Sequence, residues 1–217
     1  MAVRRVEITL VRHGESVSNV TGRWQGQGDS PLSEHGTTQA EQLGDRLADT
    51  SFDLVCSSDL TRAHDTGRRV AARWGTEPVT DPRWREIDVG VWEGLTRDEV
   101  AERFPEEIRR LGDGEPLPIG GGESWADLSK RGMGALQSLA GQLQDGQRAI
   151  VFSHGGLIGM TVAGLFGLPY RKPRRMGNIV NPSMTTLRFD GDQVRFLQFT
   201  DSLPLGPEGS WATKPRT

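Results

Sequence analysis

The residues best suited to chemistry are two histidines that follow apolar runs. His13 comes shortly after the run at residues 6–11, and His154 comes shortly after a second run at residues 149–152. An imidazole with its ordinary pKa of about 6.5 is largely neutral near pH 7, so it can act as a nucleophile. Glycine follows each histidine directly and allows the backbone to turn tightly and to approach a ligand.

Two arginines accompany these histidines. Arg12 precedes His13, and Arg62 lies just beyond a third apolar run at residues 53–56. Because the carboxyl ends of parallel strands meet at one edge of a sheet, the three strand exits would bring both imidazoles and both guanidinium groups together. Arginine forks match the oxygens of a phosphate in pairs. The pattern therefore predicts a receptor for a tetrahedral dianion.

Neither the remaining two histidines nor a metal site is expected to take part in the chemistry. His35 and His64 lie in polar, helical contexts, where a solvated side chain is the favoured interpretation. A dinuclear metal hydrolase is disfavoured, since no His-x-His or Asp-rich pair accompanies either strand-end histidine. We therefore expect no metal and no cofactor.

Short apolar runs alternate with longer helical patterns along the chain. Strands are predicted at the three runs above, and a hairpin is predicted from residues 185–189 and 194–199 around an Asp-Gly-Asp turn. Helices are predicted at residues 31–49 with Ser33 as a cap, 60–73, 124–144 and 155–166, and a capping box at Thr96 begins another. This alternation favours an α/β fold, a single domain with a mostly parallel central sheet flanked by helices.

Length and composition limit the classes of function. The 217 residues suffice for one domain, which we place at residues 1–200, followed by a Pro- and Gly-rich tail at residues 201–217. A net charge of -3 excludes a globally basic nucleic-acid binder. No run approaches the roughly 18 apolar residues of a membrane span, and the N-terminus lacks a secretory pattern, so a cytoplasmic location is expected. Cys56, the only cysteine, is interpreted as a small buried strand residue.

The motifs around these residues resemble a known family. LVRHGES at residues 10–16 is similar to the signature of the histidine phosphatase superfamily, also called the phosphoglycerate mutase-like family. The similarity continues in the family's order through Asn19, Arg23, Gln25, Gly26, residues 29–33, Gly36, Gln39, Ala40, and residues 57–66, 85–94, 121–124 and 153–156. The resemblance implies a phosphoglycerate mutase-like fold and a small phosphomonoester as the substrate.

The resemblance also implies roles for single residues. His13 would be the nucleophile that forms a phosphohistidine, and Glu86 would be the proton donor. The phosphate pocket would be lined by Arg12, Arg62 and His154, with Asn19 as a further phosphate contact and Gln25 and Gly26 on the substrate side.

Charge and proton demands of the reaction agree with these roles. Arg12, Arg62 and a cationic His154 would neutralise the phosphoryl oxygens, as a metal ion does elsewhere. A carboxylic acid opposite the nucleophile would protonate the leaving alkoxide. The apolar neighbours of Glu86, Trp84 and Ile87, are expected to bury it, while Asp88 and Glu93 are the rival acids.

Two alternatives within the family remain open. A phosphoglycerate mutase would carry Glu-Arg-His-Tyr-Gly where residues 86–90 are Glu-Ile-Asp-Val-Gly, and Gly-Asn rather than Gly-Gly after His154. An inactive regulatory member would lack part of the His-Arg-Arg-His-Glu set, which is complete here. We therefore favour a phosphatase over both alternatives.

Two segments are expected to set the substrate preference. One is the stretch at residues 104–122, which appears in the sequence as loop-rich, and the other follows the last helix. The second segment holds the densest basic cluster of the chain, formed by Arg171, Lys172, Arg174 and Arg175. These residues would form either a solvated loop or a site for a second anionic group.

Overall fold

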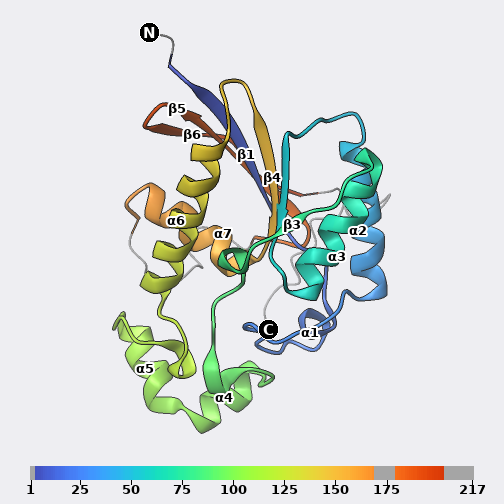
Figure 1. The fold of residues 1–217 in the computed structure, drawn as a ribbon. Helices are drawn as coiled ribbons and strands as arrows, with labels where there is room; N and C mark the ends of the chain where they lie inside the picture. Colours follow the sequence, from blue (N-terminus) through green and yellow to red (C-terminus); the bar gives the residue numbers. More distant parts are fainter. Residues whose placement is uncertain (1–2, 169–178, 203–217) are drawn as a thin grey trace.

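The computed structural model describes residues 3–168 and 179–202 of the chain. A six-stranded sheet runs through it in the order β3-β2-β4-β1-β5-β6 (Figure 1). The first four strands in that order are mutually parallel, while β5 pairs antiparallel with both β1 and β6. The predicted α/β class and mostly parallel sheet are confirmed. The strands are β1 (Arg5–Arg12), β2 (Leu54–Ser57), β3 (Val79–Thr80), β4 (Arg148–Ser153), β5 (Ser183–Asp190) and β6 (Gln193–Ser202).

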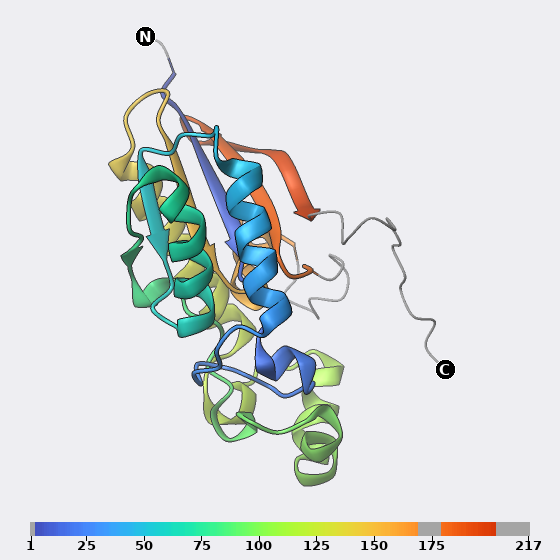
Figure 2. The same cartoon turned by 90° about the vertical axis from the view of Figure 1, so that its right-hand side faces the viewer.

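Two pairs of helices cover the two faces of the sheet. Helices α2 (Glu34–Leu47) and α3 (Thr61–Ala71) pack on one face, and α6 (Trp125–Gln142) and α7 (Gly155–Leu165) pack on the other (Figures 1 and 2). Successive residues of a strand point to opposite faces. On β4, accordingly, Val151 belongs to the core cluster under α6 and α7, whereas Ile150 and Phe152 belong to the cluster under α2 and α3. The core therefore forms two layers, one on each side of the sheet.

Two helix starts follow the capping residues predicted at Ser33 and Thr96, and a third cap, Ser124, lies at the predicted start of its helix. Ser33 Oγ accepts a hydrogen bond from Gly36 N (2.9 Å) at the start of α2. Thr96 forms a capping box with Glu99 at the start of α4 (Arg97–Arg103), and Ser124 forms one with Asp127 before α6. Within the described ranges no helix is both long and apolar enough to cross a membrane.

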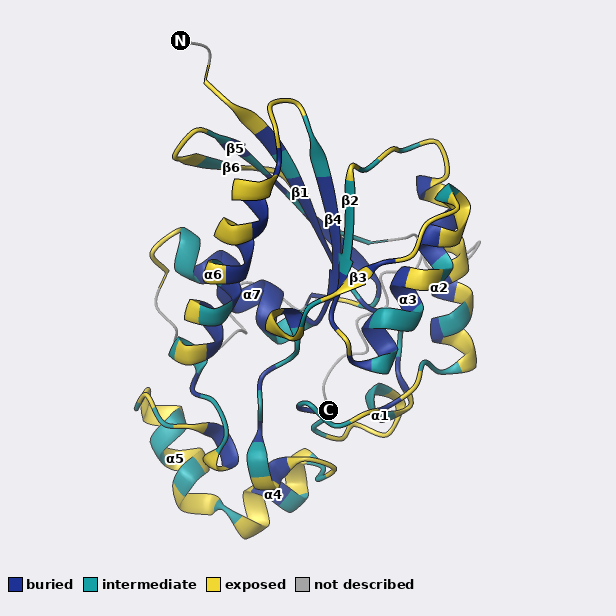
Figure 3. Cartoon of the chain, in the orientation of Figure 1, coloured by how far each residue is buried: buried dark blue, intermediate teal, exposed yellow. Residues whose placement is uncertain are grey.

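Three further helices lie beyond the carboxyl ends of the parallel strands (Figures 1 and 2). They are α1 (Val17–Val20), α4 and α5 (Pro105–Asp113), and α4 and α5 are largely exposed (Figure 3). The prediction of a loop-rich segment at residues 104–122 is wrong for α5. Pro105 occupies the first turn, where its missing N–H costs nothing, and Gly114 ends the helix at φ 88°. Short 3-10 turns span Ala72–Trp74, Pro82–Trp84, Gly90–Trp92 and Ile119–Gly121.

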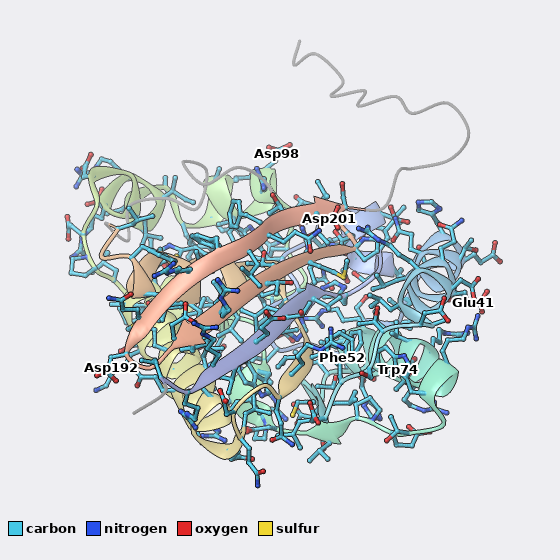
Figure 4. All side chains as sticks on the ribbon, turned by 90° about the horizontal axis from the view of Figure 1, so that it is seen from above. Glu41, Phe52, Trp74, Asp98, Asp192 and Asp201 are labelled. Carbon is cyan, nitrogen blue, oxygen red and sulfur yellow. The ribbon has the colours of Figure 1, made fainter. Side chains whose placement is uncertain are left out.

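The predicted hairpin is confirmed and is longer than the sequence indicates. Strands β5 and β6 run side by side across one edge of the sheet, with Asp192 at their turn (Figure 4). At the far end of β6, Asp201 forms an ion pair with Arg46 of α2. Strand β6 runs through Ser202, two residues past the domain end expected at residue 200. Residues 203–217 of the tail and the basic cluster at residues 171–175 lie outside the described residues.

Candidate active site

The two strand-end histidines lie against each other. His13 follows β1, and its backbone N–H donates to the carbonyl of Ser153 at the end of β4 (3.0 Å). The rings of His13 and His154 have centroids 5.1 Å apart at an angle of 63°. Both side chains are buried, at 2% and 0% exposure. The parallel pairing of β1 and β4 is what brings residues so far apart in the sequence together.

The hydrogen bond of His13 fixes which ring nitrogen can attack. Nδ1 lies 2.6 Å from the carbonyl oxygen of Gly14, and because a carbonyl only accepts, Nδ1 must carry the proton. The lone pair of the neutral ring is then on Nε2. This tautomer is the one that a nucleophile attacking phosphorus through Nε2 requires.

Asn181 supports the nucleophile from the far end of the chain. Its Nδ2 donates to the carbonyl oxygen of His13 (2.7 Å), and its own carbonyl accepts from Gln39 Nε2 (3.0 Å). Asn181 is not predicted from the sequence because no motif surrounds it. Only the antiparallel pairing of β5 with β1, directly after this residue, brings it to the site.

Both arginines are anchored and retain unused donors. Arg62 is 1% exposed, and its two terminal nitrogens donate to Gly28 O (2.8 Å) and Gly26 O (2.9 Å). Arg12 donates to the carbonyl of Ile179. Within the described residues, the Nε of each arginine is buried without a hydrogen-bond partner. Gly26, expected on the substrate side, therefore contributes its carbonyl to holding Arg62.

The electrostatics of the pocket keep both imidazoles uncharged. Burial, together with the positive charges of Arg62 and Arg12, lowers the pKa of His13 well below its usual value of 6.5. The pKa of His154 is also lowered well below 6.5, chiefly by burial and next by Arg62. The sequence predicts a cationic His154, but without an anion the structure favours the neutral ring. Burial also lowers the pKa of Arg12 to about 10, so Arg12 remains charged near neutral pH.

His154 presents one unused nitrogen to the pocket. Its Nε2 lies 2.9 Å from Ser58 Oγ, and the same oxygen accepts a hydrogen bond from Leu60 N (3.2 Å). The Nδ1 of His154 is buried and has no hydrogen-bond partner among the described residues. Buried polar atoms are normally paired, so this nitrogen fits a hydrogen bond to a ligand.

Glu86 lies at the amino end of α7, the helix that His154 caps. Its Oε2 accepts from Gly156 N (2.9 Å), and its Oε1 accepts from Leu157 N (3.1 Å) and from Ile87 N (2.9 Å). The expectation that Trp84 and Ile87 bury Glu86 is wrong in part. Trp84 and Ile87 are buried, but the Glu86 carboxylate is half-buried and meets backbone N–H groups.

The rival acids have other surroundings. Asp88 Oδ1 accepts from Gly90 N (2.8 Å) within a local turn. Glu93 is exposed, and its carboxylate lies so close to Gly28 that a Cβ placed there would be 2.5 Å from Oε1. Of the three acids, Glu86 is the one whose carboxylate is hydrogen-bonded to the helix that carries His154.

Asn19 and Gln25 lie in one loop and share a partner. Ser16 Oγ is 3.0 Å from Asn19 Oδ1 and 2.7 Å from Gln25 Oε1. Asn19 Oδ1 also accepts from Ser16 N (3.0 Å) as part of the capping box of α1. The structure therefore places both amides beside each other, with their oxygens engaged in the loop.

Three other side chains singled out from the sequence make no direct contact with the two histidines. His35 is exposed, with its Nε2 3.0 Å from Gln39 Nε2, and His64 is half-buried. Cys56 is half-buried rather than fully buried, and burial and the nearby Asp81 raise its pKa to about 11, so its thiol is a poor nucleophile. No group of three or more His, Cys, Asp or Glu side chains in the described part of the chain could hold a metal ion.

Comparison with known proteins agrees with this geometry. The family model of the histidine phosphatase superfamily (branch 1) matches residues 8–202, from β1 to the end of β6. The chain belongs to this superfamily.

Individual relatives differ in their named activities. The chain is 38% identical over 172 residues to a probable phosphoglycerate mutase, GpmB, from Klebsiella pneumoniae, covering 79% of this chain and 80% of the relative. A mycobacterial glucosyl-3-phosphoglycerate phosphatase, solved in complex with VO3, is 32% identical with a TM-score of 0.82, covering 92% and 100% of the two chains. A phosphoserine phosphatase mutant from Entamoeba histolytica, solved with phosphoserine, is 26% identical with a TM-score of 0.80, covering 90% and 96%.

Proposed function

We propose that this protein is a metal-independent phosphomonoesterase that hydrolyses a small phosphorylated metabolite through a phosphohistidine on His13. The observation that carries the proposal is the hydrogen bond from His13 Nδ1 to Gly14 O, which leaves Nε2 as a neutral nucleophile. The imidazole is held beside two anchored guanidinium groups that attract a phosphate dianion. A nucleophile that is neutral despite these charges needs no base to activate it.

The first step transfers the phosphoryl group to the protein. Nε2 of His13 attacks phosphorus while the bond to the leaving oxygen breaks, and Arg12 and Arg62 stabilise the phosphoryl oxygens. Glu86, as a carboxylic acid, gives its proton to the leaving alkoxide. His154 would hydrogen-bond a phosphoryl oxygen through Nδ1–H, and a bound dianion would favour its protonation.

The second step returns the protein to its starting state. Water attacks the phosphohistidine, the phosphorus–nitrogen bond breaks, and the Glu86 carboxylate takes a proton from the water. Inorganic phosphate leaves, and His13 is neutral again. The same carboxyl group thus serves first as an acid and then as a base.

Hydrolysis is favoured over mutase chemistry by the sequence motifs and by the names of two solved relatives. Residues 86–90 and 154–156 depart from the mutase motifs, and the two solved relatives described above are named phosphatases. A mutase must return the phosphoryl group to a hydroxyl of the same substrate, so the two activities differ in product. Incubation with 3-phosphoglycerate should release inorganic phosphate without forming the 2-isomer if this preference is right.

Trapping the intermediate tests the nucleophile. EDTA-treated protein, mixed with ³²P-labelled substrate and quenched, should carry a label that is acid-labile and base-stable, as a phosphoramidate is. His13→Ala should lose label and at least about 10⁴-fold in turnover, because the covalent route is removed. His64→Ala, which removes a half-buried imidazole of α3, serves as the matched control and should retain both. Label on another residue type, or activity that EDTA abolishes and a metal restores, would refute the mechanism.

A further inference from the structure

Arg131 of α6 uses its whole guanidinium group on one short segment. Nη1 donates to the carbonyls of Arg83 (2.9 Å) and Arg85 (2.8 Å), and Nη2 donates to the carbonyl of Glu86 (3.0 Å). Nη2 and Nε also donate to the two carboxylate oxygens of Glu123, at 2.7 and 2.8 Å. Since a guanidinium has five N–H donors, every donor of Arg131 is engaged.

Other side chains also donate hydrogen bonds to the backbone carbonyls of residues 83–86. Ser153 Oγ, at the end of β4, donates to the carbonyl of Trp84 (2.7 Å). The carbonyl of Glu86 also accepts from Gln27 Nε2 (3.3 Å). Every carbonyl from residue 83 to residue 86 is therefore held by a side chain, in a stretch whose only regular structure is a single 3-10 turn.

Glu123 orients Arg131 and reaches the same segment from the other end. Its Oε2 accepts from Asp88 N (3.0 Å), and its backbone N–H donates to Asp88 O (2.9 Å). The side chains of Arg131 and Glu123 are only 19% and 22% exposed. A bidentate Arg–carboxylate pair in this setting has a defined geometry, which a lysine with a single ammonium group cannot reproduce.

We propose that Arg131, oriented by Glu123, is a positioning residue that holds Glu86 in place to protonate the leaving group. This role of Arg131 rests on the proposed role of Glu86, and it explains what holds the Glu86 side chain in position. The N–H groups of α7 hold the carboxylate end of Glu86, and Arg131 holds its backbone end. With both ends fixed, the carboxyl group meets the leaving oxygen without reorganising, whereas a displacement of about 1 Å can cost ~100-fold in rate.

The test compares two leaving groups in Arg131→Lys. An alkyl phosphate needs a proton on its leaving oxygen, whereas p-nitrophenyl phosphate needs little. The value of kcat/KM, which reports the phosphorylation step, should fall about 10- to 100-fold for the alkyl phosphate and less than about 3-fold for p-nitrophenyl phosphate. Arg73→Lys, which alters an exposed ion pair with Asp45 remote from the candidate site, is the matched control and should change neither.

A double-mutant cycle separates positioning from a general structural role. Glu86→Gln alone should show the same leaving-group selectivity, and adding Arg131→Lys to it should cause little further loss for the alkyl phosphate, because residues that act through one another are not additive. Glu123→Gln provides a second, milder variant if Arg131→Lys folds poorly by circular dichroism. Equal losses for both substrates in Arg131→Lys, or additive losses in the cycle, would overturn the positioning role alone. A Glu86→Gln variant without selectivity would overturn the proton-donor assignment, and the positioning role with it.

Discussion

Two buried imidazoles beside two guanidinium groups define the chemistry of His13 and His154. Burial penalises the charged form of a histidine, and neighbouring cations penalise it further. Both effects act on both rings, which lowers both pKa values well below 6.5. The pocket thus holds its positive charge on the arginines and keeps the imidazoles neutral until an anion arrives. This arrangement lets one site attract a dianion and still offer it an uncharged nucleophile.

These lowered pKa values predict how stability depends on pH. In the unfolded chain both histidines titrate near 6.5, whereas in the folded protein they bind protons only at lower pH, so the unfolded state takes up more protons below pH 6.5. Their contribution to stability is fully present above the unfolded pKa of about 6.5. It is lost progressively as the pH falls from 6.5 through the lower pKa values of the folded protein. The free energy of unfolding should decrease below pH 6.5 by up to about 1.4 kcal/mol per pH unit for each histidine.

Urea unfolding between pH 7.5 and 5.5 measures this effect. His154→Gln removes one of the two buried rings and keeps a polar side chain, so its unfolding free energy should depend less steeply on pH than that of the wild type. Carboxylates titrate mostly below this window, which limits their influence. A wild-type stability that is flat across the window, or an unchanged slope in the variant, contradicts the neutral state of these rings.

The position of Glu86, the proposed proton donor, depends on the amino end of α7. His154 caps the helix, and Gly155 and Gly156 form its first turn. A Cβ on Gly155 would lie 3.1 Å from Arg12 Nε, and a Cβ on Gly156 would lie 2.3 Å from Glu86 Oε1. The pair of glycines therefore leaves room for an arginine on one side and a carboxylate on the other, and the N–H groups of Gly156 and Leu157 donate to that carboxylate.

Gly156→Ala should consequently displace Glu86 without unfolding the protein. The atom that the new methyl group meets belongs to the end of a flexible side chain, so the carboxylate can move aside. We expect kcat/KM for an alkyl phosphate to fall about 10-fold or more, since general acid catalysis contributes about 10²- to 10⁴-fold. Thermal stability should remain near that of the wild type.

Gly134→Ala is the matched control for this substitution. Gly134 lies within α6, and nothing lies within 4 Å of a Cβ placed on it. Alanine in a helix interior is favoured over glycine by about 1 kcal/mol, so this variant should be fully active and slightly more stable. If Gly156→Ala keeps the alkyl phosphatase activity of Gly134→Ala, the contact between Gly156 and Glu86 has no part in catalysis.

The sequence predicts an element well where a short run of neighbouring residues carries the pattern for it. The strands before His13 and His154 and the caps at Ser33, Thr96 and Ser124 carry local patterns, and the structure has elements there. Helix α5 was missed because Pro105 and Gly114 are common in loops, although both residues also mark helix ends. Long-range contacts leave no such pattern. The bonds from Arg131 to the Glu86 segment exist only once α6 packs against it.

The residues of the candidate site come from several elements of the fold and meet at one edge of the sheet. Helices α3 and α7 cover opposite faces of the sheet (Figures 1 and 2). Arg12 and His13 lie at the end of β1, Arg62 in α3, His154 at the start of α7, and Glu86 in the irregular segment that is hydrogen-bonded to α7. Asn181 adds a contact from the antiparallel side of the sheet. Because no single unit holds the site, a bound dianion would add contacts between elements that lie far apart in the sequence. Ligand binding and global stability should therefore be coupled.

Inorganic phosphate tests this coupling through the melting temperature. A ligand at 100 times its Kd adds about 2.7 kcal/mol of stability, which for a chain of this length raises Tm by about 5 to 10 °C. Arg62→Lys should lose most of this shift, because lysine cannot offer the paired donors of the fork. Arg68→Lys changes an exposed arginine of the same helix and should keep it, with sodium chloride at equal ionic strength as the reference. Equal shifts in the two variants would mean that the paired donors of Arg62 do not bind the dianion, because a ligand stabilises the fold through the groups that bind it.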